Sequence, residues 1–180
     1  MKYRLVLGIA TIAVLVVPTA AYAAGFLDIK VAVVKVSPRK VDSAAMVTGA
    51  IIPKDGSGGA FGYGILTGDS IIVSTTHAGV LDSKAQNGDK NNPVFHNHYV
   101  HLGTDVEHCG KNPRVTAITF ASPGKVTVAG SLLVLQDLPK TSDGLSQDGH
   151  VNRVVSFVLE VNGPAVCVTQ IQDADRKLVL

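Results

Sequence analysis

The sequence has no tryptophan, only 5% aromatic residues and only 17% charged residues. Hydrophobic residues make up 46% of the chain, and this combination of high apolar content and low charge is not typical of a disordered protein. No convincing amphipathic helix is present, and no segment after the N-terminal stretch resembles a membrane span. Valine, glycine, threonine and serine are abundant, and they favour strands and turns. The composition predicts an all-β protein.

Motifs of several functional classes are absent. There is no G-x-S-x-G nucleophile turn, and Gly56-Ser57-Gly58-Gly59 is better explained as a flexible turn. The glycines over residues 56–64 lack the Lys-Ser/Thr ending of a phosphate loop. Cys109 follows His108, but Cys–His catalysis requires proximity in space, which the sequence does not show. Catalytic residues therefore stay unassigned, and whether the protein is an enzyme stays open.

The first 23 residues have the parts of an export signal. Two basic residues precede an apolar stretch over residues 5–17, and Ala21-Tyr22-Ala23 has the small-x-small pattern of a signal-peptidase site. The stretch ends before Pro18, short of the roughly 20 residues that span a membrane, although counting on to Ala24 reaches that length. We predict a signal peptide over residues 1–23, with an uncleaved membrane anchor as the alternative. The mature protein is then secreted or lies on the exterior of the cell envelope.

Removal of the signal changes the charge of the chain. The signal contains one lysine, one arginine and no acidic residue, so residues 24–180 have 14 basic and 14 acidic residues. The slightly basic whole chain is thus no indication of a nucleic-acid partner, and no later run of lysine or arginine suggests one. The 157 remaining residues suit a single domain over residues 24–180.

Cys109 and Cys167 are the only cysteines. In an exported protein, an even pair most simply forms a disulfide bond, with two free thiols or a metal ligand as alternatives. The bond would close a loop of more than fifty residues. On the loop-entropy model it would stabilise the fold by about 4 kcal/mol, less any strain.

Short apolar or alternating segments separated by turn residues follow Gly25. Gly68-Asp69 and Asn162-Gly163-Pro164 mark tight reversals of the chain, and residues 82–92 and 139–150 are expected to be exposed loops. Nine or ten strands without a clear linker predict an antiparallel β-sandwich (Ig-like or jelly-roll-like) or a barrel. The expected strands lie at residues 27–36, 44–52, 63–67, 69–76, 94–102, 114–121, 124–130, 132–138, 154–161 and 165–171.

Three of the six histidines lie within the otherwise apolar run FHNHYVHL. In an extended strand His96 and His98 project from the same face about 7 Å apart, because side chains alternate along a strand. His101 has the opposite parity and requires a bulge or the strand end to join them. His77 follows an earlier strand and is the best candidate for a third ligand, and His108 is a further one. Imidazole groups suit Zn²⁺ and Cu²⁺, so we predict a copper or zinc site.

Carboxylates near the end of the histidine run, Asp105 and Glu107, are further possible ligands or partners of the ligating rings. The His96-Asn97-His98 pattern resembles the ligand strand of the alpha-class carbonic anhydrases and of the copper–zinc superoxide dismutases. That resemblance covers these three residues only, and membership in neither family is inferred. Blue-copper proteins are excluded, because Met46 is the only internal methionine and no histidine follows Cys167.

Two functions remain open from the sequence. The first is an exported β-sandwich that holds one copper or zinc ion, with a role in metal handling or metal-dependent chemistry at the cell envelope. The second is a non-enzymatic structural or binding domain whose histidines are incidental, either solvated on a surface strand or paired with backbone carbonyls in the core. No protein partner is predicted, and a membrane is contacted only if the signal is retained.

Overall fold

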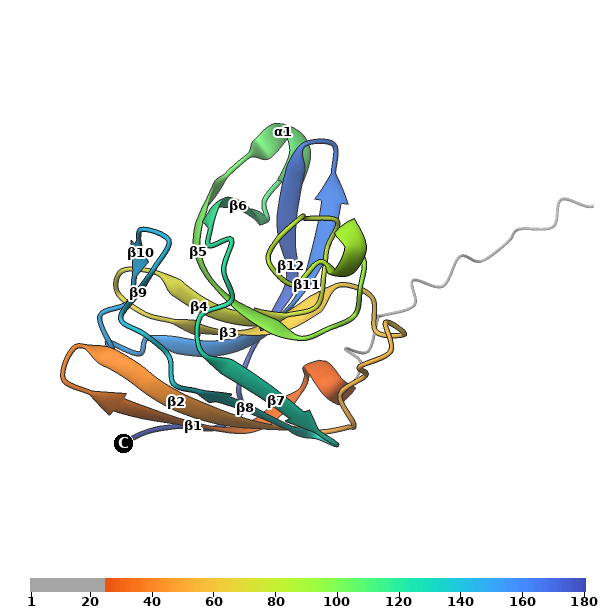
Figure 1. The fold of residues 1–180 in the computed structure, drawn as a ribbon. Helices are drawn as coiled ribbons and strands as arrows, with labels where there is room; N and C mark the ends of the chain where they lie inside the picture. The colour runs from red at the N-terminus through yellow and green to blue at the C-terminus, as the bar shows by residue number, and fades with distance from the viewer. Residues whose placement is uncertain (1–24) are drawn as a thin grey trace, which may run out of the picture.

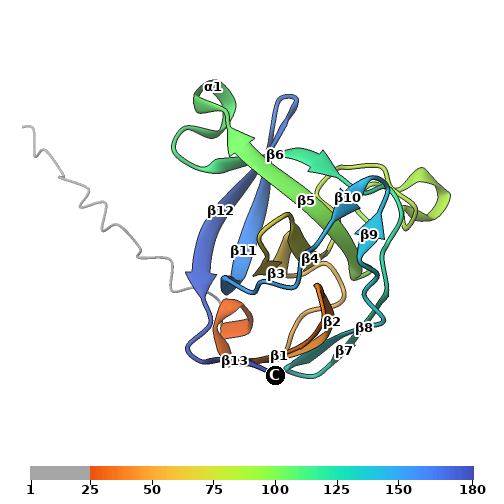
Figure 2. The same cartoon turned by 90° about the vertical axis from the view of Figure 1, so that its left-hand side faces the viewer.

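The computed structural model describes residues 25–180, so the expected signal peptide lies outside the described residues. The predicted all-β fold is confirmed: a closed six-stranded barrel packs against a five-stranded sheet (Figures 1 and 2). Short helical turns are found at η1 (Gly25–Leu27), η2 (Gln86–Gly88) and α1 (Val106–Cys109). No helix within the described part of the chain has the length and apolar character needed to span a membrane.

The barrel consists of antiparallel strands in the order β11-β12-β6-β5-β4-β3, and pairing between β3 and β11 closes it. The β3–β4 and β4–β5 pairs follow the chain, whereas β3 and β11 are far apart in the sequence. The strands are β3 (Phe61–Leu66), β4 (Ile71–Thr75), β5 (His96–Thr104), β6 (Pro113–Ile118), β11 (Arg153–Asn162) and β12 (Ala165–Asp173).

The sheet has the strand order β13-β1-β2-β8-β7, and only the β1–β13 pair within it is parallel. A small hairpin, β9 (Thr141–Ser142) and β10 (Leu145–Ser146), lies in the second long loop. The sheet strands are β1 (Ile29–Ser37), β2 (Lys40–Thr48), β7 (Lys125–Ala129), β8 (Leu132–Gln136) and β13 (Lys177–Val179).

Each of the ten predicted segments overlaps a strand of the structure. Three further strands, β9, β10 and β13, have only two or three residues, which is too short for an alternating pattern to reveal them.

The main core lies between the barrel and the sheet. Phe61, Tyr63 and Ile65 alternate along β3 and are at most 1% exposed, and they belong to the same buried cluster as Met46 and Leu133 of the sheet. The intervening positions on β3 are glycines that face the barrel interior. The β3 wall therefore separates a densely packed core from the interior of the barrel.

The barrel is weakest between β6 and β12, where Cys167 and Arg114 form the one registered pair. The predicted disulfide bond between Cys109 and Cys167 is present at this position, and its Cα atoms are 5.5 Å apart. It connects α1 to β12 and so links the two sides of the short ladder. A disulfide bond is compatible with an oxidising environment outside the cytoplasm.

We expect a Cys109→Ser/Cys167→Ser variant to fold with a free energy of unfolding lower by about 4 kcal/mol, because its unfolded chain is no longer restricted by the 58-residue link. Urea denaturation of both proteins, with and without reductant, measures the difference. Reductant should destabilise the parent protein and leave the variant unchanged. Equal stability of the two proteins would contradict the structural role of the bond.

Candidate metal centre

Strand β5 directs His96 and His98 into the barrel. Both residues alternate with outward positions and share the inward face with Val100 and Leu102, which also line the barrel cavity. The register shift between β5 and β6 leaves the extra residue, Thr116, on β6. Because β5 itself stays regular, its alternation is unbroken along the strand.

His77 reaches the same region from the chain that leaves β4. Residues 71, 73 and 75 of β4 line the cavity, and His77 continues this alternation beyond the strand end. The chain then turns at Gly79, whose φ of 75° is a conformation that glycine adopts readily. The Nδ1–H of His77 donates to the carbonyl oxygen of Val80 (3.2 Å), which fixes the ring across this turn.

Asp82 is the fourth member of the cluster, and the sequence alone placed it at the start of an exposed loop. The residue is only 7% exposed. Its Oδ1 atom accepts hydrogen bonds from the backbone N–H groups of Lys84 (2.7 Å) and Ala85 (3.2 Å). The Asn92 side chain donates to the Lys84 carbonyl (2.6 Å) and ties the loop to itself. This loop folds back on the barrel, so its first residue is buried.

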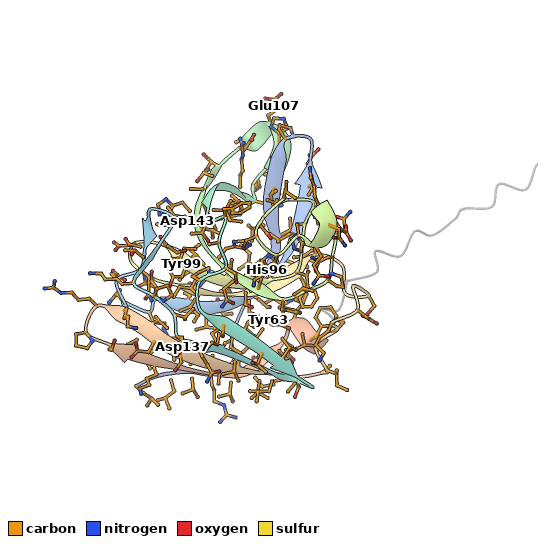
Figure 3. All side chains as sticks on the ribbon, in the orientation of Figure 1. Tyr63, His96, Tyr99, Glu107, Asp137 and Asp143 are labelled. Carbon is orange, nitrogen blue, oxygen red and sulfur yellow. A yellow bond between two sulfur atoms is a disulfide. The ribbon has the colours of Figure 1, made fainter. Side chains whose placement is uncertain are left out.

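The Asp82 carboxylate lies among three imidazole rings. Its Oδ2 atom is 2.9 Å from Nε2 of His96 and 3.3 Å from Nε2 of His98, and its Oδ1 atom is 3.7 Å from Nε2 of His77. The possible ligand atoms of His77, Asp82 and His96 all lie within 4.8 Å of one another. All four residues are 1–7% exposed, and Figure 3 shows His96 deep inside the molecule.

Hydrogen bonds to the backbone fix the tautomer of each ring. Nδ1 of His96 lies 2.8 Å from the Val94 carbonyl oxygen, and Nδ1 of His98 lies 2.7 Å from that of Thr119. A carbonyl oxygen accepts but never donates, so the proton of each neutral ring is on Nδ1. His77 has the same arrangement with Val80. All three Nε2 atoms therefore direct lone pairs at a carboxylate, which has no proton to offer them.

This arrangement favours neutral rings around an ionised carboxylate. Burial lowers the pKa of His98 to about 4, and it also lowers the pKa of His96. Burial acts to raise the pKa of Asp82, but the hydrogen bond that its carboxylate accepts from the Lys84 N–H opposes this effect, and the pKa is lowered. Among residues 25–180, the basic groups within ion-pair distance of Asp82 are histidines only, without a lysine or arginine.

A buried carboxylate facing three nitrogen lone pairs is unfavourable unless a cation lies between them. Imidazole nitrogen and carboxylate oxygen are ordinary ligands of transition metals, and the hydrogen bonds from Nδ1 to backbone carbonyls are the contacts that orient metal-bound histidines. The buried cluster of His77, Asp82 and His96, which adjoins His98, could therefore hold a metal ion.

The structure does not bring the other expected ligands to this cluster. His101 lies on the outer face of β5, where its Nε2 is 3.1 Å from Ser70 Oγ. Asp105 caps α1 and pairs with His108 (3.0 Å) and Arg114 (2.8 Å). Eight strand residues, about 26 Å, separate His96 from the end of β5. Figure 3 accordingly shows Glu107 at the outer tip.

Comparisons with protein-family models, curated proteins and solved structures found no match. The fold and the site therefore define the class of protein by themselves: an all-β protein with a disulfide bond and a buried histidine–aspartate cluster that could hold a metal ion.

We expect the metal-free protein to lose stability as the pH falls from about 6.5 to about 4. The folded state resists protonation of His98 until pH about 4, whereas the unfolded chain takes up this proton near pH 6.5. The neutral His98 ring therefore contributes roughly 3 kcal/mol to the free energy of unfolding above pH 6.5. This contribution is lost as the pH falls from about 6.5 to about 4. Urea denaturation in the presence of a chelator measures it.

His98→Asn keeps a donor for the Thr119 carbonyl and removes the titrating ring, so its stability should depend less on pH. His150→Asn at an exposed position is the control and should behave like the parent protein. An unchanged pH dependence in His98→Asn would show that another group is responsible.

Proposed function

We propose that this protein binds one divalent transition-metal ion, Zn²⁺ or Cu²⁺, inside its barrel and acts outside the cytoplasm. The proposed ligands are Nε2 of His77, His96 and His98 and the carboxylate of Asp82. Its role is then in metal handling or metal-dependent chemistry at the cell envelope.

The convergence of three Nε2 lone pairs on one buried carboxylate supports this proposal most strongly. A histidine that only fills the core needs one partner, and each Nδ1 already has a carbonyl. Nε2 of each ring therefore needs no further partner, yet all three Nε2 atoms lie within 3.7 Å of an Asp82 carboxylate oxygen. His77 Nε2 is buried without any hydrogen-bond partner. A metal ion would give all these atoms a favourable partner at once.

The donor set supports zinc or copper. Three imidazoles and one carboxylate suit four-coordinate Zn²⁺, with bonds of about 2.0–2.2 Å, and imidazole also suits Cu²⁺. Thiolate ligands are not part of the proposal, because Cys109 and Cys167 are joined to each other.

The proposed location rests on the signal-like residues 1–23 and on the disulfide bond. In that compartment, a disulfide-linked barrel with a buried site would hold a metal ion without competition from cytoplasmic thiols.

Elemental analysis of the purified protein after loading with Zn²⁺ or Cu²⁺ is expected to give about one metal ion per chain. A His96→Ala/His98→Ala variant should lose this metal, because it removes two of the four ligands. A His101→Ala/His150→Ala variant is the matched control, since it changes two exposed histidines, and it should retain the metal.

Circular dichroism of each variant shows whether the fold is intact. If the parent protein is folded but contains no metal after loading, the proposed site is excluded. A non-enzymatic structural or binding domain with incidental histidines would then be the better explanation.

Asp82→Asn should separate metal binding from folding. The amide oxygen can keep the hydrogen bonds from Lys84 and Ala85, which places the NH₂ group opposite His96 and His98. The NH₂ group would then donate to ring lone pairs that the carboxylate cannot satisfy, so the metal-free variant should be at least as stable as the metal-free parent.

The same variant should lose the stabilisation by metal, which is about 2.7 kcal/mol for the parent when free metal is 100-fold above its Kd. Thermal unfolding with and without metal measures both effects. If the metal-free variant is clearly less stable than the parent, a proton shared between Asp82 and His96 stabilises the cluster, and a metal ion is not needed.

A further inference from the structure

A cavity of about 320 Å³ occupies the interior of the barrel. All six barrel strands contribute to its lining, and so do His77, Asp82, His96 and His98. Three imidazoles and one carboxylate complete a tetrahedral zinc site, so a further ligand would be the fifth and needs an open side from which to reach the ion. Because the cavity touches all four proposed ligands, the candidate centre has such an open side.

The wall of the cavity consists mostly of apolar side chains. Val73, Val100, Val155, Phe157 and Val168 form an apolar cluster around it. Strand β3 contributes Leu66 to the lining, and its inward glycines leave room for the Phe157 ring: a Cβ atom at Gly62 would lie 2.8 Å from Phe157 Cζ. The walls therefore suit an aliphatic chain.

The other polar side chains of the lining already have partners. Arg153 pairs with Asp173 through two nitrogen–oxygen contacts of 2.8 and 2.9 Å. The hydroxyl groups of Thr75, Thr76 and Thr116 donate to the carbonyl oxygens of Phe61 (2.8 Å), Gly59 (3.1 Å) and His101 (3.2 Å). The candidate metal centre is consequently the anchor for the polar end of a molecule in this cavity.

Charge defines that polar end. A divalent ion, three neutral imidazoles and the Asp82 carboxylate sum to one positive charge in an apolar interior. A buried net charge is unfavourable, so the site should prefer a singly negative ligand over a neutral one. The cavity volume lies at the lower end of the range of about 300–1,000 Å³ for ligand sites.

We propose that the barrel binds a small aliphatic monocarboxylate, with its carboxylate on the metal ion and its chain among the valines of the cavity. This inference rests on the proposed metal site and adds the class of ligand that the site accepts. Ile118, Arg153 and Ile171 line the cavity and are exposed, so a ligand can enter between β6, β11 and β12.

Isothermal titration of the zinc-loaded protein with acetate, butyrate and hexanoate tests the proposal, and metal content is measured on the same samples. Affinity should rise by about fourfold for each added methylene group. Hexanol, which has the chain without the charge, should bind more weakly than hexanoate. Removal of the zinc should weaken hexanoate binding.

Val155→Phe should fill part of the cavity and weaken hexanoate binding while the zinc content stays the same. Val161→Phe is the matched control, because it makes the same change at an exposed position of β11 and should bind hexanoate like the parent. If zinc binds but affinity does not depend on chain length, the ligand proposal fails alone. Equal hexanoate affinity with and without zinc would contradict the proposal that the metal ion binds the carboxylate of the ligand. If no zinc binds, both proposals fail.

Discussion

The candidate site depends on one constraint: three backbone carbonyl oxygens accept hydrogen bonds from the Nδ1–H groups of three buried histidines. Because the carbonyls of Val80, Val94 and Thr119 accept these hydrogen bonds, the Nε2 lone pairs face inward, and each meets the Asp82 carboxylate. Four electron-rich groups then share a small buried volume. This conflict is what distinguishes the cluster from a set of core histidines, and a metal ion is its simplest resolution.

The barrel can keep such a site because stability comes from elsewhere in the molecule. Phe61, Tyr63 and Ile65 pack against the five-stranded sheet, while Gly62 and Gly64 on the same strand face the barrel interior. A Cβ atom at Gly62 would lie 2.6 Å from the Ser74 carbonyl oxygen, so only glycine fits there. On the barrel side, these glycines leave room for the Phe157 ring, which lines the cavity.

The sequence predicted the strands and an antiparallel sandwich or barrel, but it did not predict the order in which the strands pair. Ten strands were visible because alternation and turn residues are local properties of the chain. The β3–β11 pairing that closes the barrel joins Phe61 to Val158, and no local pattern encodes a contact between residues so far apart. In the same way the inward direction of His96 and His98 followed from strand parity, whereas Asp82 was missed. A polar residue at the start of a polar stretch gives no signal of burial, and the one link between Asp82 and the site in the sequence is its five-residue distance from His77.

The sequence by itself determined the β class, the pairing of the only two cysteines and the shared face of His96 and His98, because each depends on composition or on the alternation of a single strand. Only the tertiary structure decided that His77 and Asp82 join these two histidines, that His101 and His108 do not, and that the cluster borders an apolar cavity. Those contacts arise where the loop after β4 folds back onto the barrel. Its path is set by hydrogen bonds such as Asn92 to Lys84, which depend on the three-dimensional fold.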